Sequence, residues 1–277
     1  MKTILFPTDF SANAIHAAQY AGMLATQLKA QVVLLHAYPI PVISDQEIVF
    51  DTEISVLQSE KEAAQNLEFF ANKFMEDTGL VADQITQMVE YGATATIILD
   101  VAQKTNADLI VMGTKGTTNA IDRWIGTNAR DVMQSAACPV WIVPQNAPLH
   151  YPRHIMYAAD FKEDEVAATH KIVALAKPLG ATCRVVHIHE YFEMSVGQTV
   201  EETVAELEEE FKNEDVSVKN LNRNGIIDGL ETYIKAQKPD VLALAVYDKS
   251  FLSRIFERSV SGHFVQAAKL PMLIFRK

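Results

Sequence analysis

The stretch TILFPTDF, Thr3–Phe10, opens with an apolar run typical of a buried β-strand and closes with a proline, a threonine, an aspartate and a phenylalanine. It returns as HIMYAADF, His154–Phe161, which places Asp160 opposite Asp9. In the part of the chain between these two stretches, apolar strand patterns alternate with helical ones. A repeat of this length indicates a duplicated domain and not a solenoid of short units.

The similarity continues through both copies. RVVHIHEY follows the pattern of VVLLHAY and aligns His189 with His36. From Asp108 onward the copies keep a constant offset of 132 residues, which aligns Pro139 with Pro271. The length of 277 residues agrees with two domains of ~150 residues each. We expect one domain over residues 1–146 and a second over residues 147–277, with the proline-rich PQNAPLHYPRH as a short, stiff linker.

Strand and helix patterns alternate within the first copy. A helix over residues 11–30 follows the first strand, because Ser11 can cap it and apolar residues recur at steps of three and four. The other elements expected in this copy are strands at 31–38, 84–91, 108–112 and 139–143 and helices at 46–77, 94–104 and after Gly126. Nearly all-apolar strands that alternate with helices predict an α/β fold, with a doubly wound, Rossmann-like sheet of five parallel strands in each domain.

The amino-acid composition limits the kinds of molecule that the protein is expected to bind. The formal net charge of −11, from 24 Lys and Arg against 35 Asp and Glu, disfavours nucleic acid and anionic membranes. Part of the acidic excess lies in residues 201–215, which we interpret as a solvated helix face. Cys138 and Cys183 stand in apolar, strand-like contexts without metal-ligand spacing, which favours buried thiols in a reducing compartment. The N-terminus lacks the apolar core of a signal peptide, so we expect a cytoplasmic protein.

The stretch VMGTKGTTNAIDRWIGTNARDV gathers Gly113, Gly116 and Gly126 between a strand and a helix. Glycine lets backbone N–H groups approach a ligand without an intervening Cβ, although glycines also serve simple turns. The spacing fits neither a Walker-type P-loop nor a Gly-x-Gly dinucleotide turn. If the first and fourth strands are neighbours, Thr8 and Asp9 face this glycine loop across one crevice, and the helix after Gly126 presents free N–H groups that suit a polyphosphate.

The spacing Gly113-x2-Gly116-x9-Gly126-Thr127, with the opening ILFPTDFS and the later CPVWIVP, resembles the universal stress protein family over the whole chain, as two copies. The resemblance implies that Asp9 sits against adenosine, that the Ala37 backbone contacts adenine, and that the glycine loop surrounds ribose and phosphates. Asn128 stands where many nucleotide-binding members carry Val. The residues implied to bind the nucleotide are Thr8, Asp9, Ala37, Met112, Gly113, Gly116, Gly126, Thr127 and Asn128.

The leading interpretation is a stress-response protein that binds ATP, with or without Mg²⁺, in its first domain and regulates an unknown protein partner without catalysis. A slow ATPase or self-phosphorylating protein is one alternative. A module that binds another small ligand in the second domain is the other. In the family the last strands commonly pair, so PVWIVP and PMLIFRK are expected to form an internal pseudo-dimer, with a homodimer of tandem chains as a further option.

The second copy is expected to have lost the nucleotide site. At the offset of 132, Gly113, Gly116 and Gly126 become Ala245, Asp248 and Arg258, while Thr127 becomes Ser259. A carboxylate where phosphates would bind is repulsive, and an Asp248–Arg258 pair could fill the crevice. We therefore expect one ATP per chain.

A metal site is the remaining alternative for the second copy. His187 and His189 share a strand face near Glu190 and Glu193. A structural role for these histidines, and for His36, is the simpler interpretation.

Overall fold

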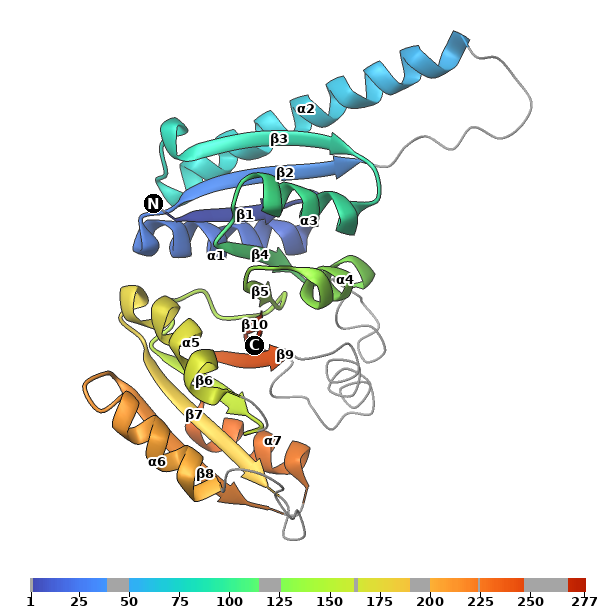
Figure 1. The fold of residues 1–277 in the computed structure, drawn as a ribbon. Helices are drawn as coiled ribbons and strands as arrows, with labels where there is room; N and C mark the ends of the chain where they lie inside the picture. Colours follow the sequence, from blue (N-terminus) through green and yellow to red (C-terminus); the bar gives the residue numbers. More distant parts are fainter. Residues whose placement is uncertain are drawn as a thin grey trace. The chain divides into compact units, whose positions relative to one another are not determined.

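The computed structural model of the chain describes residues 2–38, 50–114, 126–161, 164–189, 200–223, 225–246 and 269–277, with only the backbone over 50–56. The chain folds into two compact units. The first unit is built on the elements from β1 to α4, and the second includes everything from residue 141 onward (Figure 1).

The first copy contains β1 (Thr3–Pro7), α1 (Ala12–Leu28), β2 (Gln31–Tyr38), α2 (Phe50–Thr78), η1 (Ala82–Gln84), β3 (Ile85–Tyr91), α3 (Thr94–Lys104), β4 (Leu109–Gly113), α4 (Thr127–Ser135) and β5 (Val140–Val143). The strands follow the order β3-β2-β1-β4-β5. The pairs β2–β3, β1–β2 and β1–β4 are parallel. The chain therefore winds from β1 toward β3 and then returns to the other side of β1. The winding direction reverses between β1 and β4.

The second copy contains β6 (His154–Ala159), α5 (Glu165–Leu179), β7 (Thr182–His189), α6 (Val200–Glu210), β8 (Val216–Asn222), α7 (Ile226–Gln237), β9 (Val241–Val246) and β10 (Met272–Arg276). Its strands follow the order β10-β9-β6-β7-β8, and every one of these pairs is parallel. Followed from β8 to β10, this strand order is the same as that of the first copy from β3 to β5. The predicted fold class, two tandem doubly wound α/β domains with five parallel strands each, is confirmed.

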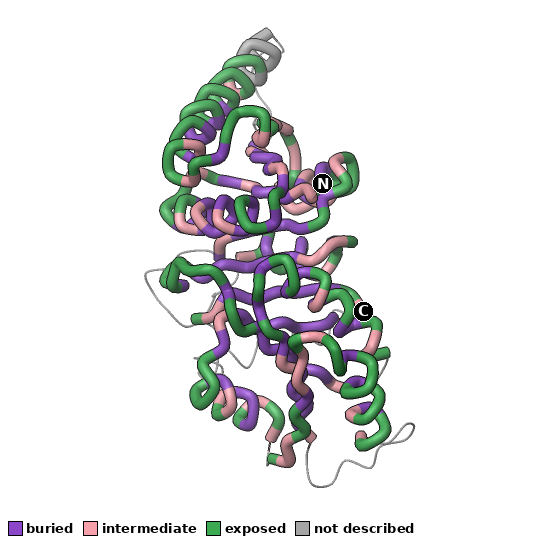
Figure 2. The backbone as a smooth tube through the Cα atoms, turned by 90° about the vertical axis from the view of Figure 1, so that its left-hand side faces the viewer, coloured by how far each residue is buried: buried purple, intermediate pink, exposed green. Residues whose placement is uncertain are grey.

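The strands form the buried centre of each unit, and helices cover them (Figure 2). In the first unit α1 and α2 pack together, as do α3 and α4. Ser11 caps α1 as expected, because its side chain accepts the N–H of Ala14. Close packing of α1 on α2 requires a glycine at position 22, since an added Cβ would lie 2.1 Å from Cγ2 of Thr78.

Hydrogen bonds at the strand ends confirm the offset of 132. Asp108 accepts the N–H of Thr3, and Asp240 accepts that of His154, at 2.8 and 2.9 Å. In the first strands and helices of each copy the shift is instead 151, because the register pairs Thr3 with Gln31 in one unit and His154 with Thr182 in the other.

The shift of 151 corrects one alignment made from the sequence. His36 corresponds to His187 and not to His189. The pattern RVVHIHEY contains two histidines at alternate positions, and matching on the wrong one moves the alignment by two residues, which preserves the face of the strand. Periodicity alone could not separate the two alignments.

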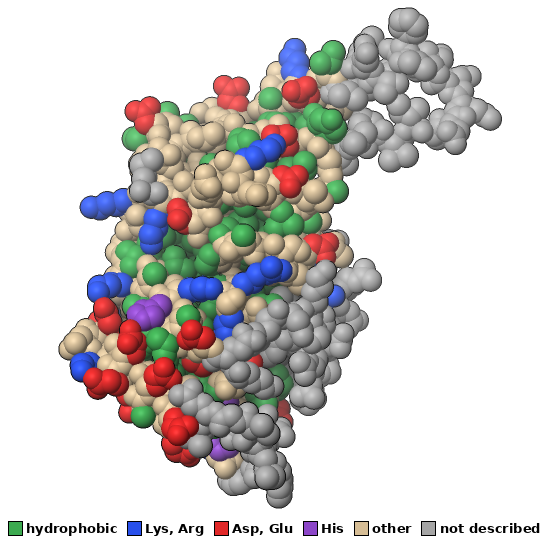
Figure 3. Space-filling model, viewed as in Figure 1, with side chains coloured by type: hydrophobic (Ala, Val, Ile, Leu, Met, Phe, Trp, Pro, Cys, Tyr) green, Lys and Arg blue, Asp and Glu red, His purple; other side chains and the backbone are tan. Residues whose placement is uncertain are grey.

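The acidic segment at 201–215 is helical only as far as Glu210, where α6 ends. Thr203 and Leu207 are its buried residues, and most of its glutamates are exposed, as expected for a solvated face. Acidic side chains crowd the part of the second unit visible in Figure 3. Among the described residues, no helix is both long and apolar enough to span a membrane.

Candidate functional site

The point where the winding reverses brings two predicted loops together. Because β1 pairs with β4, the loop after Pro7 and the end of β4 at Gly113 lie at the same edge of the sheet. Asp9 is exposed at this edge, and its Oδ1 accepts the N–H of Ser11 at 3.0 Å. In the part of the chain that the structure describes, no Lys or Arg forms an ion pair with Asp9.

Thr8, Phe10 and His36 hold the loop in place. The buried Thr8 hydroxyl accepts the N–H of Phe10 at 3.0 Å. Nδ1 of His36 lies 2.8 Å from the Thr8 carbonyl oxygen and must donate, since a carbonyl can only accept. Phe10 adopts a φ of 62°, rare for a residue with a Cβ, and its ring lies 4.4 Å from the His36 ring. Thr8 and His36 therefore position Asp9, and the expected structural role of His36 is confirmed.

Gly113 has a packing role that the sequence analysis did not foresee. A Cβ at this position would lie 3.0 Å from the backbone oxygen of Asn13 and 3.4 Å from Cβ of Ala17, both in α1. The absence of a side chain lets α1 approach the end of β4. In the second copy the equivalent residue is Ala245, and α5 begins at Glu165, so the equivalent of Asn13, Asp164, lies outside the helix as its N-cap.

The start of α4 is the candidate anion site. Gly126 is the N-cap, with φ −62° and ψ 157°, and it has no side chain to cap the helix. Thr127 and Asn128 are exposed in the first turn. The first N–H groups of a helix lack intrahelical partners and suit a negative charge. Gly116 lies outside the described residues.

Two further predicted contacts lie on the strands themselves. Ala37 is partly exposed near the end of β2, consistent with a backbone contact. Met112 is only 7% exposed, so its side chain belongs to the core. Any ligand contact from Met112 would come from its backbone.

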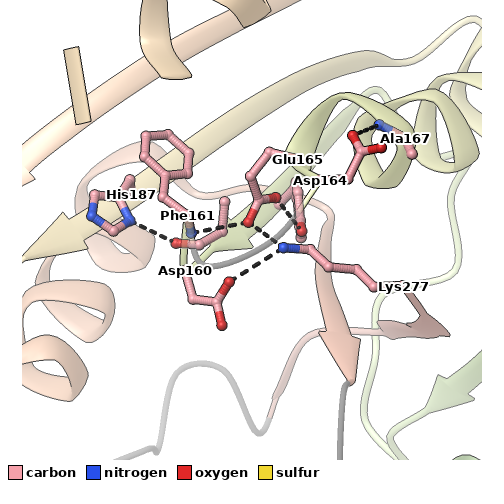
Figure 4. A network of polar contacts seen from close by, with 9 residues as sticks. Asp160, Phe161, Asp164, Glu165, Ala167, His187 and Lys277 are labelled. Carbon is pink, nitrogen blue, oxygen red and sulfur yellow. Dashed lines mark hydrogen bonds and ion pairs between the residues drawn. The ribbon is translucent and has the colours of Figure 1, made fainter. Parts of the chain in front are cut away.

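The equivalent edge of the second unit is filled by its own side chains (Figure 4). Nζ of Lys277 lies 3.3 Å from Oδ1 of Asp160 and also forms an ion pair with Glu165. Glu165 accepts the Tyr157 hydroxyl at 2.7 Å and the Phe161 N–H at 2.9 Å. The side chains of Lys277 and Glu165 are only 4% and 1% exposed. An internal cation thus occupies the position beside the aspartate.

Three residues that build this network differ together between the copies. The counterparts of Tyr157, Glu165 and Lys277 in the first copy are Phe6, Ala14 and Gln145. Burial raises the pKa of the Glu165 carboxyl, and the neighbouring Lys277 and Tyr157 oppose that effect. None of the three was identified from sequence patterns, although aligning the copies position by position shows a charged pair where the first copy has alanine and glutamine. The suggested pair of Asp248 and Arg258 lies outside the described residues, as does Ser259.

The histidines of the second unit make structural contacts. Nδ1 of His187 donates to the Ala159 carbonyl at 3.0 Å, and its ring stacks on Phe161 at 4.1 Å, which repeats the arrangement of His36. Nδ1 of His189 lies 2.9 Å from Oδ1 of Asn220. Within the described ranges, no group of three or more His, Cys, Asp or Glu side chains could hold a metal. Glu190 and Glu193 lie outside those ranges.

Neither thiol is paired. Cys138 and Cys183 are both free cysteines. Burial raises the pKa of Cys138 to about 11 and that of Cys183 to about 12. Cys183 is buried as expected, whereas Cys138 is partly exposed.

The architecture defines a tandem α/β protein with a doubly wound arrangement of strands in each repeat and an exposed aspartate at the strand ends of the first. The universal stress protein family model matches residues 1–144 and 152–276, so the chain belongs to that family, as two consecutive copies. A universal stress protein of Methanocaldococcus jannaschii is 32% identical over 142 residues, which cover 51% of this chain and 81% of the relative.

Solved structures show the same tandem fold. A universal stress protein from Archaeoglobus fulgidus, 16% identical, covers 99% of this chain and 96% of its own with a TM-score of 0.68. A putative universal stress protein from Pseudomonas aeruginosa, 15% identical, covers 100% of this chain and 93% of its own with a TM-score of 0.56. At these identities the likeness concerns the fold.

Proposed function

We propose that the first unit binds ATP and that the protein acts as a ligand-dependent regulator. The observation that carries the proposal is the contrast at the strand edge. Asp9 is exposed without a described cationic partner, whereas its equivalent Asp160 is neutralised by Lys277. A carboxylate is suited to accept hydrogen bonds from ribose hydroxyls. The resemblance of the glycine spacing to the nucleotide signature of the family supports ATP as the ligand.

Each part of the site has a separate role in this proposal. Asp9 holds the ribose, the backbone at Ala37 contacts adenine, and the first turn of α4 receives the phosphates. Charge-assisted hydrogen bonds contribute roughly 1.5–3 kcal/mol each, so three or four approach the ~8 kcal/mol of a micromolar complex. Mg²⁺ bound with ATP would neutralise part of the phosphate charge. The proposal assigns the divalent ion to the nucleotide and not to a protein site.

We propose a regulatory and not a catalytic role because binding ATP needs fewer groups than hydrolysing it. Oδ1 of Asp9 accepts the Ser11 N–H, which fixes the side chain that would accept a ribose hydroxyl in this proposal. Phosphoryl transfer would also need a nucleophile in line with the γ-phosphate and a metal clamp. Binding without turnover requires neither. Phosphate release that scales with protein concentration and disappears in a Gly116→Val variant would establish hydrolysis instead.

Calorimetry with ATP tests the proposal. Asp9→Asn should weaken binding about tenfold or more through loss of a charge-assisted bond. Asp100→Asn, an exposed charge-matched change in α3, should leave binding unchanged. Gly126→Val should abolish binding and keep the fold, because the backbone at Gly126 is in an extended conformation open to any residue. Equal ATP affinity for the wild type, Asp9→Asn and Gly126→Val would reject the proposal.

A further inference from the structure

A cavity lies between α1 and α2 and is also lined by Phe10, the residue after Asp9. Its volume is about 400 Å³, within the usual range of small-molecule sites. Its apolar walls come from Phe10, Ala18, Phe69, Phe70 and Phe74. Such a concentration of aromatic side chains around one concave surface is typical of a site for an apolar ligand.

The aromatic walls are held in place from behind. The rings of Phe10 and Phe70 lie 5.7 Å apart at an interplanar angle of 57°, and Phe70 also stacks on Phe6 at 6.2 Å. Phe6 is fully buried, and Phe74 is 3% exposed. These side chains belong to the core of the unit. The inner wall is therefore rigid, which lowers the entropic cost of binding.

The outer rim is apolar as well, and this is the unusual part. Phe69 is 77% exposed and Ile15 is 48% exposed, and among the described side chains of α1 and α2 only Leu57 is another exposed large apolar residue. Both residues line the cavity. Exposed apolar side chains beside a cavity mark a ligand site more often than isolated ones do.

The charges at the rim balance each other. Nζ of Lys73 lies 2.8 Å from Oδ1 of Asp77, and both residues line the cavity. The other polar lining residues, Gln19, Asn66 and Thr78, are neutral. The cavity therefore offers an incoming ion no net counter-charge. Burying an uncompensated charge against the phenylalanine walls would be unfavourable.

We propose that this cavity binds a small, uncharged aromatic molecule. Ring faces of Phe10, Phe70 and Phe74 would contact the ligand, and Phe69 would cover it at the rim. The proposal does not depend on nucleotide binding. It does predict a ligand close to the crevice, because Phe10 directly follows Asp9 in the loop.

A pair of fluorescent probes tests both the site and its preference for neutral ligands. N-phenyl-1-naphthylamine is uncharged, and 8-anilinonaphthalene-1-sulfonate has the same aromatic skeleton with one sulfonate added. With the full chain and saturating ATP present, the neutral probe should show a blue-shifted, saturable signal and bind about tenfold more tightly than the sulfonate. Equal binding of both probes, or loss of the neutral-probe signal when ATP is added, would overturn the proposal.

Substitutions inside and outside the cavity show where the neutral probe binds. Ala18→Leu adds bulk to the inner wall and should weaken the neutral probe about tenfold, and Phe69→Ser should weaken it about fivefold. Phe69 is exposed, so its replacement decides the question even where Ala18→Leu perturbs folding. Tyr91→Ser removes an aromatic ring that is 60% exposed on β3 and does not line the cavity, and should bind as the wild type does. If Phe69→Ser binds like Tyr91→Ser, the cavity is not the site.

Discussion

The strand edges that carry Asp9 and Asp160 share a scaffold and differ in the side chains around the aspartate. In both, the residue after the aspartate adopts positive φ, at 62° in Phe10 and 54° in Phe161, and packs on a histidine that donates to the carbonyl two residues before that phenylalanine. In the first the aspartate is exposed. In the second, Lys277 pairs with Asp160 and Glu165. The scaffold therefore belongs to the fold, and the chemistry depends on residues placed upon it.

Duplication explains how such a difference can persist. One copy that binds a ligand leaves the other free to accumulate substitutions. The polar groups at its strand edge must still have hydrogen-bond or ionic partners. An open crevice needs a ligand or water to pair its carboxylate. A crevice with an internal cation needs neither, at the cost of desolvating the ion pair. The second unit is thus expected to keep one conformation whether or not nucleotide is present.

The largest expected effect comes from removing the internal cation. Lys277→Met leaves Glu165 buried and without its cationic partner, which should reduce the free energy of unfolding by about 3–5 kcal/mol. Urea denaturation measures the loss. Lys235→Met, at an exposed position in α7, provides the matched control and should change stability little.

Combining Lys277→Met with Glu165→Ala, the residue of the first copy, should recover part of that loss. Glu165 contributes to the penalty only while its charge is buried and unpaired. Purely additive losses in the double variant would show that the two side chains act independently and would contradict the network.

Substitutions of Gly113 and Gly126 should have different effects, one on protein stability and the other on ATP binding. Gly113→Ala forces a Cβ to 3.0 Å from the Asn13 backbone oxygen and should destabilise the protein by about 1–3 kcal/mol. Gly126→Val should leave the thermal midpoint nearly unchanged while ATP binding is lost. Thermal unfolding without ligand compares the variants. A stable Gly113→Ala protein would show that the approach of α1 to β4 is not close in solution.

A smaller effect concerns pH. Burial raises the pKa of Glu165 above its ordinary value of 4.5, so the stability linked to its protonated form is fully present below that value. That stability is lost as the pH rises through the folded-state pKa. Relative to Glu165→Gln, the wild type should therefore become less stable with rising pH. Urea midpoints of both proteins between pH 4 and 8 measure the difference, and parallel profiles would argue against a raised pKa.

Sequence patterns predicted the fold closely because buried parallel strands have a distinctive composition. The expected strand at 31–38 and helix at 94–104 coincide with β2 and α3. The neighbouring positions of β1 and β4 were assumed in the interpretation of the glycine loop, and the structure shows that the two strands pair. Pairing of the last strands of the two copies stays a prediction.

The site was less predictable, because its chemistry depends on long-range contacts. Nothing local to Lys277 indicates that it reaches Glu165, which is far away in sequence. The packing role of Gly113 depends on α1, a helix distant along the chain. The glycine pattern was therefore interpreted through ligand approach or turn formation, and not through helix packing. Comparing the copies residue by residue is the sequence signal that carries information about the second crevice.

The stoichiometry of ATP binding to the full chain tests the central comparison most directly. Titration calorimetry should give one ATP per chain, with binding weakened by Asp9→Asn and unaffected by Asp160→Asn. That result follows if the first crevice is open and Lys277 satisfies the second. Two equivalent sites per chain, or a single site that is lost on Asp160→Asn and kept on Asp9→Asn, would contradict the account.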